Sequence, residues 1–266
     1  RQVTGSEATY PLGSLGYAEA FEPLKAETEA EDFFRRVNGA VALARLNLSD
    51  AQAQQVNETL KTVYAGMPDD MQGLQAKAQI LANMRQTYDP ALQPFFLQES
   101  QNEDLHPAVR IEAVKAYALL ANEAEAERLE AWINGLDDED GYKASYQTET
   151  AKALETAKAC DEDMNCYIGK LDDSEMEVAR KASFMLGRLG SGNQQAIEAL
   201  VGKLDSSEVE VRLSAIHALD AIATDGAEAA VTKIEELREA EEGRAIWNNF
   251  AREALPIQAR LRARAQ

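Results

Sequence analysis

Cys160 and Cys166 are the two cysteines of the chain, and they lie close together in the stretch "ACDEDMNCY". Their C-x5-C spacing suits no zinc site, because neither of the two histidines lies nearby in the sequence. The spacing also differs from the C-x-x-C motif of redox enzymes. Two alternatives remain: a disulfide that closes a helical turn, or a pair of reduced thiols. An isolated, close pair in a cysteine-poor chain favours the disulfide, which indicates a location outside the cytosol, periplasmic, cell-surface or secreted.

The acidic stretch "LDDEDGYKASYQ", from Leu136 to Gln147, has part of the spacing of a calcium-binding loop. Asp138, Asp140 and Gly141 would occupy the third, fifth and sixth places of an EF-hand loop. Leu136 and Gln147 then stand at the two ends, where carboxylates are required. The sequence therefore predicts a solvated acidic turn and no metal site.

Other motifs that could carry chemistry are incomplete. Gly190 and Gly192 are followed by Gln195 where a dinucleotide fingerprint needs a third glycine, and they follow a helical pattern, so they indicate a turn. His106 precedes a proline at a helix start, and His217 lies next to an apolar helix face. Neither histidine has a neighbouring nucleophile or metal cluster. We predict no catalytic residue and no cofactor.

The C-terminal 24 residues are basic, whereas the rest of the chain is acidic. They carry five arginines against Glu253, a net charge of +4, so the remainder of a chain with net charge −19 carries −23. One interpretation is a terminal capping helix whose arginines complement the helix dipole, and we favour it. Arg260, Arg262 and Arg264 alternate, however, and so splay over a wide arc of a helix. This surplus of charge makes these three arginines the candidate partner-binding residues.

Composition indicates an all-α protein that does not bind nucleic acid. Ala, Glu, Gln and Leu dominate, aromatic residues make up only 6% and glycines and prolines are few. A net charge of −19 repels phosphate groups and anionic lipid surfaces. No apolar run approaches the roughly 20 residues of a membrane span. The chain begins at Arg1 without Met, so we expect a processed or trimmed start that is compatible with a removed export signal.

The same pattern recurs along the chain. The stretch "KLDDSEMEVARKASFMLGRLG" from Lys170 returns 33 residues later as "KLDSSEVEVRLSAIHALDAIA" from Lys203. In both, apolar residues at i, i+4, i+7, i+8 and i+11 form one face of a helix. The template fits at six places, whose first residues are 33, 74, 109, 146, 178 and 211. Shorter stripes, such as 129–136, 164–171 and 197–204, predict a second helix in each repeat. Ala121-Asn122 and Asp225-Gly226 fall between stripes and predict turns.

Six helical hairpins are therefore expected, and a hairpin alone cannot bury both of its stripes. Stacking buries each stripe against a neighbour and produces a solenoid. The stretch "LHPAVRIEAVKAYALL" from Leu105, together with the two repeats from Lys170 and Lys203, resembles HEAT repeats of the short bacterial type first described in phycobilin lyases. The matching features are a polar helix start, then Val109-Arg110 or Val211-Arg212, then the face of Ala and Leu. The resemblance covers about 104–238. It implies a right-handed superhelix of helix pairs that binds macromolecules on its inner surface, and it implies no chemistry.

Residues 1–29 contain Pro23 among several glycines and prolines and show no helical periodicity until Glu27, which is typical of a loop or leader. The chain therefore divides into a leader or capping segment at 1–29, a solenoid at 30–240 and a basic capping helix at 241–266. The predicted function is a non-enzymatic, protein-binding scaffold whose partner is unidentified. The alternative is a structural subunit whose oppositely charged ends meet head to tail in a homo-oligomer or filament. A third class, enzymes similar to phycobilin lyases or HEAT-like DNA glycosylases, is disfavoured by the acidic charge and by the absence of a catalytic cluster.

Overall fold

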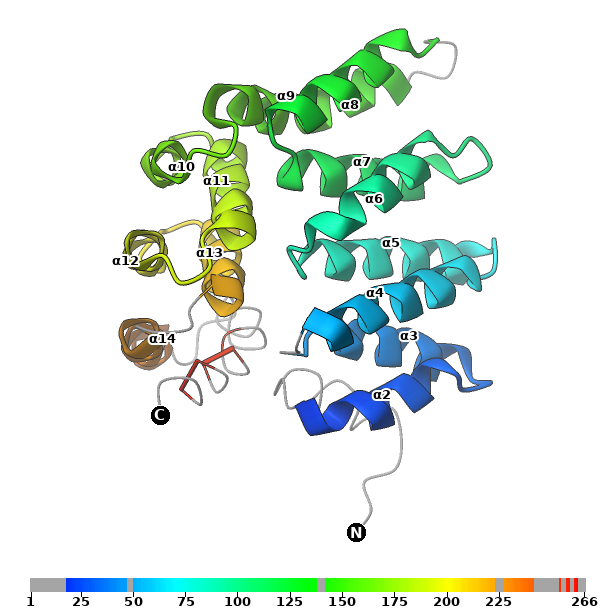
Figure 1. The fold of residues 1–266 in the computed structure, drawn as a ribbon, viewed down its shortest axis with the longest axis horizontal. Helices are drawn as coiled ribbons and strands as arrows, with labels where there is room; N and C mark the ends of the chain where they lie inside the picture. The colour runs from blue at the N-terminus through cyan, green and yellow to red at the C-terminus, as the bar shows by residue number, and fades with distance from the viewer. Residues whose placement is uncertain are drawn as a thin grey trace. The chain divides into compact units, whose positions relative to one another are not determined.

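The fold is all-α throughout the part of the chain that the structure describes (Figure 1). The computed structural model describes residues 18–46, 50–137, 142–222 and 227–241, together with residues 254, 257, 258, 261 and 262. Two 3-10 turns and thirteen α-helices, without a strand, account for the regular structure of these residues. None of the described helices combines the length and the apolar composition that crossing a bilayer would need.

The chain forms two compact units. The first consists of Arg1–Thr87 and Asn102–Ala113, and the second of Tyr88–Gln101 and Val114–Gln266. The described elements of the first unit are η1 (Ala18–Ala20), α2 (Phe21–Thr28), α3 (Phe33–Leu43), α4 (Asp50–Ala65) and α5 (Met71–Arg85). Helix α7 (Pro107–Leu120) begins in the first unit and ends in the second. The other elements of the second unit are η2 (Pro90–Leu92), α6 (Gln93–Gln101), α8 (Glu123–Gly135), α9 (Tyr142–Cys160), α10 (Met164–Lys170), α11 (Met176–Leu189), α12 (Gln194–Lys203), α13 (Val209–Ile222) and α14 (Ala227–Glu241).

The six longer apolar stripes predicted from the sequence all lie on helices, namely α3, α5, α7, α9, α11 and α13. The shorter stripes lie on α8, α10 and α12. The turns predicted at Ala121-Asn122 and at Gly190–Gly192 separate these helices, while the turn predicted at Asp225-Gly226 lies outside the described residues. The prediction of an all-α fold built from repeated helical hairpins is confirmed.

Helix α2 was missed by the sequence analysis, which assigned 1–29 to a leader without helical periodicity. Phe21 and Leu24 of α2 are buried, and the helix packs against α3. A Cβ atom on Gly39 of α3 would lie 2.9 Å from Glu27 Cβ, so the two helices approach closely at that glycine. Pro23 suggested a loop, but in the first turn of a helix proline breaks no hydrogen bond because its N–H would have no partner there.

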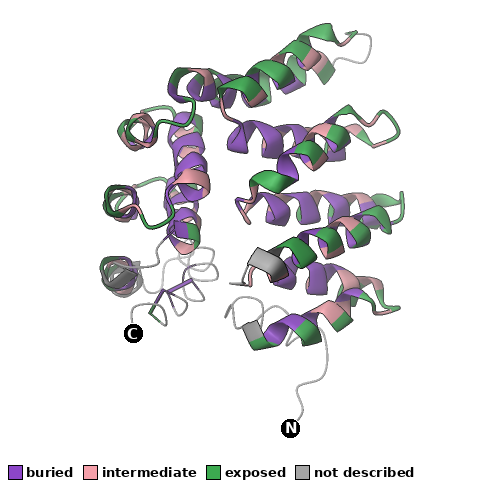
Figure 2. Cartoon of the chain, in the orientation of Figure 1, coloured by how far each residue is buried: buried purple, intermediate pink, exposed green. Residues whose placement is uncertain are grey.

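The core of the second unit lies between two rows of helices. Helices α11 and α13 pack side by side, and α10, α12 and α14 form a second row against them (Figure 1). Ala182 and Ala215, at the second position of the repeat template, have no exposed surface, and neither have Leu186 and Leu219. Small alanines let neighbouring helices approach, while the leucines fill the space between the rows. Helix α11 is buried along most of its length, whereas α10 and α12 expose one face (Figure 2).

Candidate functional site: a disulfide turn and a polar junction

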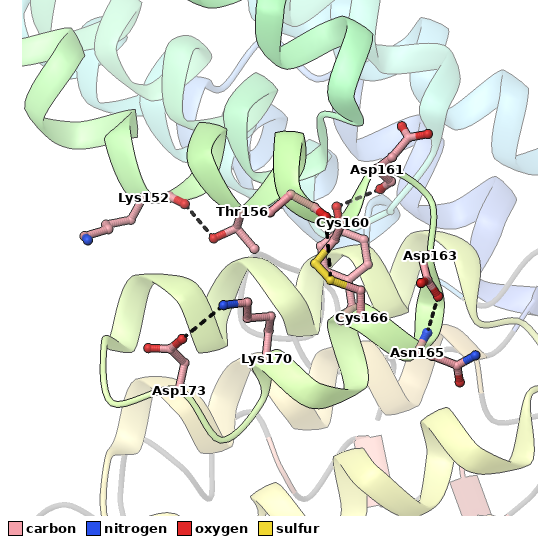
Figure 3. The surroundings of a disulfide bond; sticks show 11 residues. Lys152, Thr156, Cys160, Asp161, Asp163, Asn165, Cys166, Lys170 and Asp173 are labelled. Atoms are coloured by element: carbon pink, nitrogen blue, oxygen red, sulfur yellow. Dashed lines mark hydrogen bonds and ion pairs between the residues drawn. A yellow bond between two sulfur atoms is a disulfide. The ribbon is translucent and has the colours of Figure 1, made fainter.

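A disulfide joins Cys160, the last residue of α9, to Cys166 in α10. The two Cα atoms are 5.4 Å apart, and the bond closes the turn between the helices (Figure 3). Cys160 is buried and Cys166 is half-buried. The phenol of Tyr167, which is fully buried, donates a hydrogen bond of 2.8 Å to the carbonyl oxygen of Asp161. The turn is thus fixed both by a covalent bond and by a buried side chain.

Acidic side chains of the disulfide turn contact the start of α8. Asp161 Oδ1 accepts a hydrogen bond of 3.1 Å from the backbone N–H of Glu123, and Glu162 Oε1 accepts one of 3.1 Å from the side-chain amide of Asn122. Asn122 and Glu125 also form a capping box within α8. The first N–H groups of a helix have no partner within the helix, and the helix dipole favours negative charge there. The turn therefore caps a helix that precedes it by almost 40 residues.

The carbonyl end of α7 is held by two cations of α11. Lys181 is fully buried, and its Nζ donates hydrogen bonds to the carbonyl oxygens of Ala118 (3.0 Å), Leu119 (3.0 Å) and Ala121 (2.5 Å). Arg188 donates to the carbonyl oxygen of the remaining residue of this stretch, Leu120. The last carbonyl groups of a helix lack partners within the helix, so α11 supplies the donors that α7 needs.

Arg188 also forms a 2.7 Å ion pair with Glu125, which links the end of α7 to the start of α8. Burial raises the pKa of the Glu125 carboxyl, but hydrogen bonds from Arg188, the Asn122 backbone and Gln93 outweigh burial and leave the pKa below its ordinary value. Burial, and next the positive charge of Arg188, lower the pKa of the Lys181 ammonium well below its usual range. We call the side chains of Gln93, Glu125, Lys181 and Arg188 the polar junction.

A second contact attaches α11 to an earlier part of the chain. The ring of Tyr88 lies against Gly187, where an added Cβ atom would come within 2.6 Å of Tyr88 Cε1. Tyr88 also contacts the ring of Phe184, with centroids 5.5 Å apart, and its backbone has φ 55°. A positive φ is costly for a tyrosine, so the packing around the ring must hold this conformation.

These contacts of α11 were not found by the sequence analysis, which treated each hairpin as touching its neighbours. Residues of α11 bind positions 88 and 118–121, at least 60 residues earlier, across the α8–α9 hairpin. A signal was present in the comparison of the two similar repeats. Lys181, Gly187 and Arg188 correspond, at the 33-residue offset, to Ser214, Asp220 and Ala221. The apolar face is shared between the repeats, but the opposite face differs wherever α11 makes its distant contacts.

The tail arginines are described only in part. Arg262 pairs with Glu235 of α14, while Arg260 and Arg264 lie outside the described residues. Ile257 and Leu261 are buried in the same hydrophobic cluster as α11 to α14.

The Arg262–Glu235 pair resembles two earlier ion pairs that join successive hairpins. Lys203 pairs with Asp172, and Lys233 pairs with Asp205 at 2.7 Å. Part of the tail charge therefore serves contacts within the chain.

The remaining candidates from the sequence carry no site among the described residues. His106 Nδ1 accepts a hydrogen bond of 3.2 Å from the backbone N–H of Ala108 and so caps the start of α7. Asp138, Asp140 and Gly141 lie outside the described residues. Within the described ranges, no group of three or more His, Cys, Asp or Glu side chains is placed to hold a metal ion.

Comparison with known proteins identifies the repeats. Residues 168–247 match the family model described as HEAT repeats. This segment of the chain is therefore similar to HEAT repeats. No curated protein matches it.

The solved structures that the comparison matched include two engineered proteins and a designed repeat protein. An engineered protein from the Northeast Structural Genomics Consortium is 16% identical, with a TM-score of 0.34 over 92% of this chain and 97% of that one. A second engineered protein from the same consortium is 17% identical, with a TM-score of 0.29 over 96% of this chain and 76% of that one. A designed armadillo repeat protein is 16% identical, with a TM-score of 0.28 over 91% of this chain and 98% of that one.

Proposed function

We propose that this protein is a non-enzymatic scaffold that binds another protein outside the cytosol. The observation that carries the proposal is the HEAT-like segment at 168–247, whose hairpins bury one row of helices and expose one face of the other row. Stacked repeats present extended surfaces, which suit recognition of a macromolecule better than chemistry on a small molecule. The polar junction is compatible with this function, because the hydrogen bonds of Lys181 and Arg188 go to helix ends within the chain.

The disulfide supports the proposed location. Disulfides are rare in reducing compartments, where thiols are kept free, and persist in exported proteins. To test the location, the protein is isolated from its source and alkylated under denaturing, non-reducing conditions. We expect no label on Cys160 or Cys166 by mass spectrometry. Two labels on freshly isolated protein would contradict both the disulfide and the extracytoplasmic location.

Capture of the partner tests the scaffold function. The purified chain is immobilised and exposed to extract of the source organism, with a disulfide-free, designed helical repeat protein of equal net charge as the control. A partner specific to this chain, retained in a fixed molar ratio and again when purified, supports a scaffold. Binding no different from that of the control contradicts the proposal, because it reflects acidic charge alone.

A structural subunit that assembles head to tail is the second candidate, favoured by the +4 charge of the tail against −23 on the rest. Static light scattering as a function of protein concentration separates the two functions. A mass that grows with concentration supports assembly, whereas a constant monomer mass contradicts it.

Two variants test whether the tail arginines mediate either kind of association. Replacing Arg260, Arg262 and Arg264 with Gln removes the charge, and association through the tail should weaken and lose its salt dependence. Glu235→Gln is the matched control, because it frees Arg262 from its partner on α14 and keeps the tail charge. Association should then persist or strengthen. If the triple variant binds as the wild type does at low salt, the tail is only a cap.

A further inference from the structure

The Cys160–Cys166 bond closes a turn whose side chains hold a different helix. Asp161 and Glu162 lie between the two cysteines and bind Glu123 and Asn122 at the start of α8. The position of both carboxylates therefore depends on the conformation of the closed turn. These contacts connect the redox state of one hairpin to the capping of another.

Within the closed turn, Asp161 has φ 49°, a conformation that residues other than glycine rarely adopt. Such a conformation persists only where its surroundings fix it. Three contacts restrain it here: the disulfide, which begins at the preceding residue; Tyr167, whose hydroxyl donates to the carbonyl oxygen of Asp161; and the backbone N–H of Asp161, which donates to the carbonyl oxygen of Ala157 at 2.7 Å. Opening the disulfide removes the covalent restraint, and the backbone of Asp161 can then relax toward negative φ and withdraw its carboxylate from α8.

The start of α8 is also held by groups that do not depend on the disulfide. Its capping box is formed by Asn122 and Glu125, and Glu125 is fixed in turn by Arg188 and Gln93. Removing the contacts from the turn therefore weakens the first turn of α8 and leaves its anchor to α11 in place. The expected response to reduction is local, because the polar junction remains intact.

We propose that the Cys160–Cys166 bond is a redox-sensitive latch on the N-terminus of α8, opened by a small dithiol. Cys166 is the half-buried residue of the pair and Cys160 the buried one, so the thiolate of the dithiol attacks Cys166 Sγ. The sulfur–sulfur bond breaks, and Cys160 leaves as a thiolate that takes up a proton. The second thiol then displaces Cys166 from the mixed disulfide. The dithiol ends as its own disulfide, and two electrons have passed to the protein.

Carboxylates around the bond control the rate of this reaction. Asp161, Glu162 and Asp163 are exposed and lie within the closed turn, between the two cysteines in the sequence. Their negative charge repels an approaching thiolate, and salt screens this repulsion. The rate of reduction by dithiothreitol should therefore rise with KCl concentration.

Hydrogen exchange followed by mass spectrometry on the full chain, before and after treatment with dithiothreitol, tests the latch. We expect roughly fivefold faster exchange at 122–126, because removal of a helix cap lowers the protection of these amides by about that factor. Exchange in 160–167 should also accelerate. Helix α11, which Lys181 and Arg188 anchor independently, should keep its protection.

Two variants make the result decisive. Asp161→Asn with Glu162→Gln keeps the disulfide but weakens the contacts of the turn to α8. The start of α8 should then exchange faster without reductant, and reduction should raise its exchange rate little further. The rate of reduction of this variant should depend less on salt than that of the wild type. Cys160→Ser with Cys166→Ser should match the reduced wild type, after circular dichroism has verified its helix content. Unchanged exchange at 122–126 after reduction, or equal acceleration in every helix, would overturn the proposal, as would a rate indifferent to salt.

Discussion

Lys181 and Arg188 show why charged residues occur inside an otherwise apolar helix packing. Burying an ammonium group costs several kcal/mol unless hydrogen bonds replace its water. Lys181 meets this condition with three carbonyl groups, which carry the partial negative charge of the C-terminal end of α7. Arg188 meets it with Leu120 and with the carboxylate of Glu125. Each cation therefore stabilises a helix end that would otherwise contain buried carbonyls without donors.

Replacing each cation in turn tests this account. Lys181→Met keeps the volume but leaves buried carbonyl groups unpaired, and should lower the free energy of unfolding by about 2 kcal/mol. Arg188→Met also strands the carboxylate of Glu125 and should cost about 3 kcal/mol, the lower end for a buried pair because Glu125 is partly exposed. Urea unfolding measures both. Adding Glu125→Gln to Arg188→Met should recover part of the loss, whereas simply additive losses would contradict the pairing.

The contribution of Glu125 to the pH dependence of stability should reverse when Arg188 is removed. In the wild type the pKa of Glu125 is lowered from its ordinary value of 4.5, so its contribution is complete above that value. The contribution is lost as the pH falls through the lower, folded pKa, because the unfolded chain binds the proton first. Arg188→Met removes the main group that lowers the pKa of Glu125, so burial raises this pKa. The variant should therefore become more stable relative to the wild type as the pH falls. Urea unfolding between pH 7 and pH 3 measures the difference, and parallel pH profiles would contradict it.

At the scale of elements, the corner between α7 and α8 is held from two sides. Helix α11 binds the carbonyl end of α7, and the disulfide turn binds the amide end of α8. In the sequence, helix α10 connects the disulfide turn to helix α11. Contacts between hairpins that are not neighbours in the sequence thus reinforce a fold whose apolar stripes alone would pack only successive hairpins.

The close approach of Tyr88 to α11 depends on a glycine. Gly187→Ala would place a Cβ atom 2.6 Å from the tyrosine ring, and should lower the free energy of unfolding by about 1–3 kcal/mol. Gly202→Ala on α12 is the matched control, since nothing lies within 4 Å of its Cβ position, and should stabilise by about 0.5–1 kcal/mol. Thermal and urea unfolding measure both. In a Tyr88→Ala background the cost of Gly187→Ala should disappear, and a persistent cost would show that the ring is not its cause.

The sequence predicted the helices better than it predicted their contacts. Six apolar stripes of one template placed six helices, because a stripe at helical spacing must face a core whatever its partner is. Pro23 concealed α2, since the same residue signals a loop in general and is tolerated in the first turn of a helix. Lys181 and Gly187 lie on the face that the template left to solvent. A buried lysine is recognised only when the carbonyl groups that satisfy it are known, and these lie 60 residues away.

At the scale of the molecule, the two compact units are assembled from interleaved segments. The chain leaves the first unit after Thr87, returns at Asn102 and leaves it again within α7. The segment with η2 and α6 therefore belongs with helices that follow it by up to 100 residues, through contacts such as that of Tyr88 with Gly187. Loss of structure should spread within a unit before it reaches the other, and it need not follow the order of the hairpins along the chain.

Leu186→Ala tests this cooperativity, because Leu186 is fully buried in the core of α10 to α14 and the change should cost about 2–5 kcal/mol. We expect hydrogen exchange to accelerate not only in α9 to α14 but also at 88–101 and 114–121, which α11 holds through Tyr88 and Lys181. Helices α3, α4 and α5 should keep their protection. Acceleration confined to α10–α14 would mean that only neighbouring hairpins are coupled, as in a simple solenoid, and equal acceleration in every helix would mean that the two units share one core.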